Sequence, residues 1–113
     1  MSDTIFSKII RKEIAAEFVH EDDQCIAIKD TNAQAPVHIL VIPKKPIAKL
    51  ADATVDDEQL LGHLLLVAGK ISHELGIGDA FRLVINNGSE AGQTVFHLHM
   101  HVVGGRHLEW PPG

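Results

Sequence analysis

The sequence predicts an α+β fold, in which one antiparallel sheet of about five strands packs against one long and one short helix. Two observations carry this prediction. Short β-branched and apolar runs recur along the chain, and a single long helical pattern lies between the early runs and the late ones. A helix placed between groups of strands, rather than alternating with them, is typical of the α+β class.

The first half of the chain contains four of these elements. Residues 4–13 predict a short helix, because isoleucines recur at helical spacing and a serine, an aspartate or a threonine precedes them as a cap. Residues 16–20 and 25–29 predict two strands that are joined by a polar turn at 21–24. Residues 37–42 are β-branched and almost wholly apolar, which indicates a central strand covered on both faces.

The second half begins with the long helix. Residues 54–57 have the spacing of a capping box, and the helical pattern runs from there to about residue 75. Its expected apolar stripe consists of Leu60, Leu61, Leu64, Leu65, Ala68, Ile71 and Leu75. His63 and His73 lie off the centre of this stripe, so we expect both on the surface. Residues 81–85 then predict another strand.

Residues 96–103 organise the functional prediction. We expect them to form a strand, in which side chains alternate between two faces, so that His97, His99 and His101 share one face. The apolar residues between them, which would anchor the other face in the core, are Leu98, Met100 and Val102. His38 interrupts the apolar run of the earlier central strand, which makes it a further candidate for a functional role.

Three interpretations of these histidines stay open from the residues alone. They could be ordinary strand histidines, although three on one face argue against this. They could bind a transition metal together with His38, although the strand supplies no acidic ligand. They could include a nucleophilic imidazole that acts on phosphorus. The preceding loop, residues 86–94, is rich in Gly, Asn, Ser and Thr and so offers N–H and hydroxyl groups to an anion.

Composition limits the class of protein. The chain has 113 residues, 45% of them hydrophobic, which favours one domain with a mainly aliphatic core. A formal net charge of −5 without a basic cluster argues against a nucleic-acid partner. The single cysteine, Cys25, cannot form an internal disulfide, and no secretory signal or apolar run of membrane-spanning length is visible. We therefore expect a cytoplasmic protein that does not associate with membranes.

The histidine segment matches a known signature. His97-Leu98-His99-Met100-His101-Val102-Val103 has the pattern His-φ-His-φ-His-φ-φ, with φ hydrophobic, and resembles the histidine-triad (HIT) family. Further matches to the histidine-triad nucleotide-binding (Hint) branch of that family occur at 34–38, 41–45, 60–64, 104–106 and 110–113. The resemblance covers nearly the whole chain. It implies a single HIT domain over residues 1–113, whose proline-containing tail, 106–113, we expect to be irregular.

The resemblance implies a purine nucleoside phosphoramidase and nucleotidyl hydrolase. The expected partner is a purine nucleotide, as an AMP or GMP conjugate joined through a P–N bond or to an acyl group. By match, His99 is the nucleophile and forms a nucleotidyl-histidine, while His97 and His101 contact phosphoryl oxygens and assist proton movement. His38 completes a hydrogen-bond chain with them. We expect no cofactor and no metal.

The resemblance also implies the residues that bind the substrate. Asp30 takes both ribose hydroxyls, and Thr94 lies near the leaving group. Asn86, Gly92 and the Val95 backbone contact the phosphate. The apolar slot for the purine is formed by Phe6, Ile9, Ile28, Thr31 and Leu40. The family is homodimeric through the long helix and a strand, so we also expect a homodimer.

Three other functions stay open beside the phosphoramidase. A diadenosine polyphosphate hydrolase of the sister branch usually carries a Gln two residues before the first histidine, where this chain has Val95. A nucleotide-binding regulatory protein with weak activity would depend on its surfaces more than on turnover. A zinc-binding protein would use the histidines as ligands. The intact set of four histidines favours an active enzyme.

Overall fold

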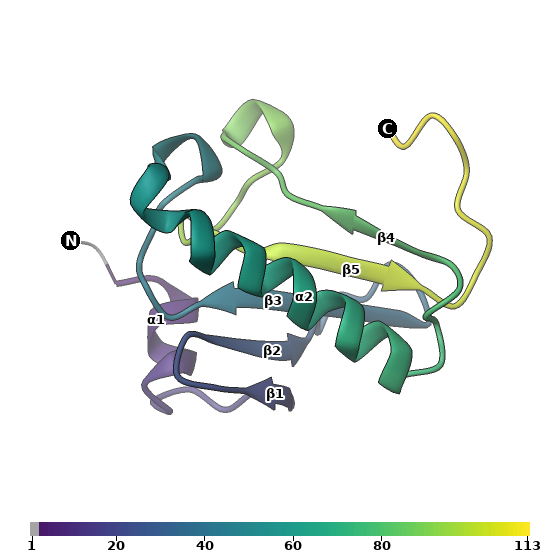
Figure 1. Cartoon of the computed structure of the whole chain (residues 1–113), viewed down its shortest axis with the longest axis horizontal. Coiled ribbons are helices and arrows are strands. Elements are labelled where there is room, and N and C mark those ends of the chain that lie inside the picture. The colour runs from purple at the N-terminus through teal and green to yellow at the C-terminus, as the bar shows by residue number, and fades with distance from the viewer. Residues whose placement is uncertain (1–2) are drawn as a thin grey trace.

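One five-stranded antiparallel sheet with a helix on each face makes up the fold (Figure 1). The computed structural model describes residues 3–113. The strands are β1 (Phe18–Glu21), β2 (Cys25–Lys29), β3 (Val37–Pro43), β4 (Phe81–Val84) and β5 (Met100–Gly104). The helices are α1 (Ile5–Ile10) and α2 (Glu58–Glu74), with short 3-10 turns at Leu50–Asp52, Val55–Asp57 and Ser89–Ala91. This architecture confirms the predicted α+β fold, and its strands follow the order β1-β2-β3-β5-β4 across the sheet.

Alternation along β3 divides the core into two layers. Ile39 and Val41 pack in the layer beneath α2, which crosses in front of the sheet in Figure 1. Leu40 and Ile42 pack in the opposite layer, beneath α1. Because both faces of β3 are covered, nearly every residue of this strand is buried. The structure therefore confirms that residues 37–42 form a central strand covered on both faces, which explains why the run is apolar.

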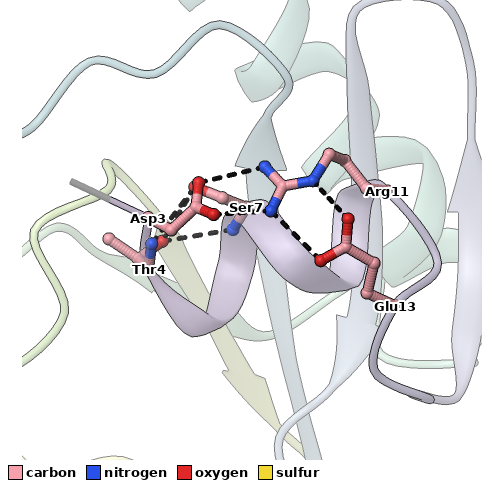
Figure 2. Close-up of polar contacts among 5 residues, drawn as sticks. All are labelled: Asp3, Thr4, Ser7, Arg11 and Glu13. Atoms are coloured by element: carbon pink, nitrogen blue, oxygen red, sulfur yellow. Dashed lines mark hydrogen bonds and ion pairs between the residues drawn. The ribbon is translucent and has the colours of Figure 1, made fainter. Parts of the chain in front are cut away.

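Polar side chains fix both ends of the short helix α1. The Thr4 hydroxyl accepts the Ser7 N–H at 3.1 Å, and the Ser7 hydroxyl accepts the Thr4 N–H at 3.4 Å. The guanidinium of Arg11 bridges Asp3 and Glu13, with a 2.7 Å contact to each carboxylate (Figure 2). A helix of six residues is not stable in isolation. These contacts and the burial of its apolar face therefore hold it in place.

The short helix ends earlier than the predicted residue 13. Lys12 has a φ of 65°, in the left-handed region that non-glycine residues rarely adopt, and the chain turns away after Ile10. The turn returns the chain towards β1. On the buried side of the helix, Phe6 and Ile9 point into the core and also form part of the candidate site.

The contact face of α2 is narrower than the predicted stripe. Its buried apolar residues are Leu64, Val67, Ala68 and Ile71. They have the i, i+3, i+4, i+7 spacing of one helix face, so a residue directly after one of them points outward. Leu65 and Leu75 are 53% and 38% exposed, and their assignment to the stripe is wrong. The capping box at 54–57 is confirmed, although it caps the 3-10 turn that leads into α2.

Beyond Gly104, the described chain continues to Gly113 without a helix or strand. Trp110 is 80% exposed, and the guanidinium carbon of Arg82 lies 5.9 Å from its ring centroid. The indole is therefore held against a surface side chain and not in the core. Within residues 3–113, no helix combines the length and the apolar character that crossing a bilayer requires.

Candidate active site

A cavity of about 770 Å³ opens on the α1 side of the sheet. Helix α1 and the segment after it form one wall, and the ends of β2 and β3 form another. Among the residues that the sequence predicts for the site, those that line it are Phe6, Ile9, Ile28, Asp30, Thr31, His38, Leu40, Thr94, Val95, His99 and His101. The fold thus gathers side chains from residue 6 to residue 101 around one space.

The histidine segment is only partly a strand. Strand β5 begins at Met100, so His97 and His99 precede it, and the prediction of a strand from residue 96 is wrong. The cause lies in the segment after β3, which takes the hydrogen bonds: the Leu98 N–H donates to the Ile47 carbonyl at 2.6 Å. The alternation between the two faces survives this change, although His97 and His99 are buried as well. Leu98, Met100 and Val102 are all buried in the layer beneath α2, which leaves the histidines on the other side.

His99 is held in one tautomer. Its Nδ1 lies 2.8 Å from the backbone carbonyl of His97. A carbonyl oxygen can only accept, so Nδ1 carries the proton and Nε2 has a free lone pair in the neutral ring. The edge of Phe6 packs against the ring with 4.9 Å between centroids, which limits its rotation. The side chain lines the cavity although it is only 7% exposed. An oriented, unprotonated imidazole nitrogen is a competent nucleophile.

A hydrogen-bond chain runs from the Gln34 backbone to His101. The Gln34 N–H donates to His38 Nδ1 at 3.0 Å, so His38 carries its proton on Nε2. That nitrogen lies 2.9 Å from His101 Nδ1 and 3.3 Å from an Asp30 carboxylate oxygen. His101 Nδ1 is therefore the acceptor, and His101 keeps an N–H on Nε2. Burial, together with the neighbouring His99 and His38 rings, lowers the pKa of His101 to about 4.

His97 does not line the cavity. Its Nε2 donates to the Pro43 carbonyl at 2.7 Å, and the side chain is only 2% exposed. Burial lowers its pKa, so the ring is neutral at pH 7. In this geometry the ring bonds with the carbonyl of Pro43, the last residue of β3, and does not line the cavity in which His97 is predicted to contact a phosphoryl oxygen. Its own carbonyl, in contrast, fixes the tautomer of His99.

The loop before the histidines meets the cavity only at its end. Thr94 and Val95 line the cavity, whereas Asn86 and Gly92 do not. The latter two lie side by side: a Cβ added at Gly92 would be 3.9 Å from the Asn86 side-chain nitrogen. Gly92 also has a φ of 94°, a left-handed conformation that suits glycine. The predicted phosphate contacts of these two residues would require a substrate that extends past Thr94.

Gln93 is a buried residue that the sequence analysis did not single out. Its side-chain oxygen accepts the Gly88 N–H at 2.8 Å, and its side-chain nitrogen donates to the Ala48 and Val95 carbonyls at 2.9 and 3.0 Å. It is 3% exposed. The amide thus ties the loop to the segment after β3. Its only sequence signal is one amide within a polar loop, which is equally typical of a solvated residue.

A metal could be held here only at the expense of this network. Asp30, His38 and His101 each bring one ligand atom to within 4.8 Å of the others. However, both ring nitrogens of His38 already take part in hydrogen bonds, one to the Gln34 N–H and one to His101. The predicted alternative of a metal bound by the whole histidine row is not formed, since His97 and His99 lie outside this group. The hydrogen-bonded arrangement of Asp30, His38 and His101 suits proton transfer and phosphoryl chemistry better than metal coordination.

Comparison with known proteins places the chain in a family. The model of the HIT domain matches residues 11–108. An uncharacterised HIT-like protein of Synechocystis sp. is 67% identical over 111 residues, which cover 98% of this chain and 97% of that protein. A HIT family hydrolase from Legionella pneumophila has a TM-score of 0.96 at 44% identity, covering 98% of this chain and all of that one. A HIT family hydrolase from Clostridium thermocellum has a TM-score of 0.93 at 42% identity, covering 96% of each chain. The family model matches most of the sequence and the structural likeness extends over nearly all of it, so this chain belongs to the histidine-triad (HIT) family and has the fold of its hydrolases.

Proposed function

We propose that this protein is a purine nucleoside phosphoramidase of the Hint branch, which hydrolyses P–N and acyl-phosphate conjugates of nucleoside 5′-monophosphates. The observation that carries the proposal is the hydrogen bond from His99 Nδ1 to the His97 carbonyl. It leaves Nε2 of a cavity-lining imidazole unprotonated and oriented, which is what attack on phosphorus requires.

The reaction follows in two steps. His99 Nε2 attacks the phosphorus, the P–N bond breaks, and the leaving nitrogen takes up a proton from solvent. Water then attacks the nucleotidyl-histidine and releases a proton, so that the nucleoside monophosphate leaves and His99 Nε2 regains its lone pair. The proton on Nδ1 stays on the ring throughout, and the His97 carbonyl stabilises the positive charge that develops there.

His101 acts as a neutral donor in this scheme. With a pKa near 4 and its Nδ1 occupied by His38, it offers the Nε2 N–H to a phosphoryl oxygen at pH 7. The chain through His38 and Asp30 keeps this tautomer in place. Thr94 lies on the cavity wall and would contact the leaving group.

The opposite part of the cavity suits a nucleoside. Asp30 has one oxygen bonded to the Asn32 N–H at 2.8 Å and the other near His38, and a carboxylate accepts further hydrogen bonds from ribose hydroxyls. Apolar side chains next to it would enclose a purine between its faces; they are Phe6, Ile9, Ile28 and Leu40. Because such a slot has few groups that read base edges, we expect adenine and guanine to be accepted similarly.

The test is single-turnover hydrolysis of an adenosine 5′-phosphoramidate, with the products separated by chromatography. We expect His99→Ala to abolish turnover while AMP binding, measured by calorimetry, stays largely intact. The matched control is His73→Ala, which removes an exposed histidine of α2 and should change neither quantity. Residual turnover near the wild-type rate in His99→Ala would refute the nucleophile. Nucleotide binding without turnover in the unaltered protein would instead identify a nucleotide-binding protein.

A further inference from the structure

A second group of histidines lies outside the cavity, where the β1–β2 turn meets α2. His20 Nε2 and His63 Nε2 both lie 2.7 Å from the same oxygen of Asp22, Oδ2. The Cys25 thiol lies 3.6 Å from that oxygen as well. None of these four residues lines the candidate active site. His63 was predicted to lie on the surface, and its side chain is 33% exposed, but its ring is also bonded to a carboxylate 41 positions away.

These residues are the donor types that Zn²⁺ selects. Imidazole nitrogen, thiolate sulfur and carboxylate oxygen are its usual ligands, and four of them around the ion form a tetrahedral site. The donor atoms of His20, Asp22 and Cys25 lie within 4.8 Å of one another. His63 approaches the same carboxylate oxygen from α2, but it lies outside that group, so its ring would have to move towards the other donors to complete the site.

The separations from Asp22 Oδ2 are close to those of a tetrahedral site. With metal–oxygen and metal–sulfur bonds of about 2.0 and 2.3 Å, the oxygen and sulfur of such a site are about 3.5 Å apart. The observed distance from Cys25 Sγ to Asp22 Oδ2 is 3.6 Å. An oxygen and an imidazole nitrogen in the same site are about 3.3 Å apart, so each ring at 2.7 Å would have to withdraw by only about 0.6 Å.

The carboxylate is oriented for this role. Oδ1 of Asp22 accepts the backbone N–H groups of Gln24 and Cys25, each at 2.8 Å, which leaves Oδ2 towards the other donors. Hydrogen bonds that fix a ligand from behind are typical of metal sites. The side chains of His20, Asp22 and His63 are 15%, 24% and 33% exposed, so an ion can reach them from solvent, whereas Cys25 is fully buried and would bind the ion from the core side.

We propose that His20, Asp22, Cys25 and His63 form a binding site for a zinc-class divalent cation that links the β1–β2 hairpin to helix α2. The cation takes the place of the two N–H protons that now lie between the rings and Asp22 Oδ2. Each of these protons moves to Nδ1 of its ring, so both histidines stay neutral. The thiol of Cys25 loses its proton to solvent and binds as the thiolate. One proton is therefore released for each ion bound.

The test uses Co²⁺ as a spectroscopic probe on the intact protein. Cys25 is the only cysteine, so a thiolate-to-cobalt charge-transfer band in the near ultraviolet reports this site alone and is silent on any ion near His101. We expect the band to grow to one equivalent of Co²⁺, together with the visible bands of tetrahedral cobalt, and to disappear when Zn²⁺ is added.

Variants separate the site from chance binding. Cys25→Ser should lose the band, and His63→Gln should weaken cobalt binding by more than about tenfold. Because His63 is partly exposed, this variant should fold normally, and circular dichroism checks that it does. His73→Gln, on the same helix but outside the cluster, should bind cobalt as the unaltered protein does. The absence of the band in folded protein at millimolar Co²⁺ would overturn the proposal, as would full cobalt affinity in both His63→Gln and His20→Gln.

Discussion

At the scale of single residues, the candidate site depends on which ring nitrogen carries each proton. Backbone groups decide this: a carbonyl holds the proton of His99 on Nδ1, and an amide holds that of His38 on Nε2. Imidazoles near neutral pH interconvert easily between tautomers, so a fixed backbone partner is what makes the roles of the rings distinct.

The lowered pKa of His101 predicts a loss of stability on acidification. The unfolded chain takes up a proton near pH 6.5, whereas folded His101 resists it down to about pH 4. This contribution to the free energy of unfolding is complete above pH 6.5 and declines as the pH falls towards 4, by at most about 3 kcal/mol. Urea denaturation at pH 7 and at pH 4.5 measures the decline, and His97 adds to it in the same direction.

The control for this prediction is His101→Gln, which keeps a polar side chain but does not titrate. Its stability should fall less between pH 7 and 4.5 than that of the unaltered protein. The pH range from 7 to 4.5 avoids the titration of Asp22. Burial would raise the pKa of this carboxyl, but hydrogen bonds from His20, the Gln24 N–H and His63 hold it below its ordinary 3.8. Equal losses in the two proteins would assign the effect to other groups.

Asp30 predicts a selective effect on ribose recognition. In Asp30→Ala the proposed acceptor for the ribose hydroxyls is gone, so we expect AMP to bind about tenfold more weakly while the 2′,3′-dideoxy analogue changes little. The comparison of the two ligands by calorimetry removes any general effect on the fold. If both ligands lose affinity equally, Asp30 has no role in binding ribose.

Gln93 predicts a structural effect that reaches the cavity. Gln93→Ala removes three hydrogen bonds, two within the loop region and one to the Ala48 carbonyl after β3, and the groups left behind are partly buried. We expect the free energy of unfolding to fall by about 1–3 kcal/mol, as measured in urea. We also expect KM for the phosphoramidate to rise, since Thr94 and Val95 follow directly. Unchanged stability would mean that water replaces the amide without cost.

At the scale of elements, α1 is both a helix and a wall of the cavity. Thr4→Ala removes its capping box, which should cost about 1 kcal/mol of stability and raise KM with little change in kcat. The matched control is Thr54→Ala, which removes the capping box of the 3-10 turn that leads into α2, on the other side of the sheet. It should cost similar stability without raising KM. Equal effects on KM would show that general stability, and not the position of α1, governs binding.

The strands also show where sequence patterns are enough to predict the bounds of an element. The bounds of β2 are those predicted, and β3 differs only by the addition of Pro43, because continuous apolar runs have one way to be buried. The start of β5 was not predictable, since the backbone N–H of Leu98 in the segment before it bonds to a loop residue, Ile47, and not to a strand. The bond of His63 to Asp22 was not predictable for a similar reason, because the two residues are distant in sequence.

The candidate site was also predictable only in part. The identity of most cavity residues follows from the family motif, because a motif preserves side-chain types at fixed positions. The motif did not indicate that His97 turns inward to Pro43 or that Gln93 anchors the loop. Both facts depend on where a backbone carbonyl or amide lies after folding, and one sequence holds no direct signal for that.

At the scale of the whole molecule, exposed apolar residues remain on α2. Leu65 and Leu66 are 53% and 77% exposed, and β4 lies at an edge of the sheet. We propose that the protein forms a homodimer, in which these features of one subunit pack against the same features of the other and are buried there. Sedimentation should give a dimer for the unaltered protein and a monomer for Leu66→Lys at micromolar concentration. A monomer in both cases would remove the dimer, whereas His73→Lys should leave the result unchanged.

The strand order has a consequence for how the molecule is made. Strand β5 comes last in the sequence yet lies between β3 and β4, so neither neighbour has its full set of backbone partners until residue 104 has been synthesised. While the chain emerges from the ribosome, the edge of β3 stays open to any extended peptide nearby. The proposed nucleophile, His99, and the strand that completes the sheet are therefore synthesised within a few residues of each other, so the proposed active site is not complete before the sheet is.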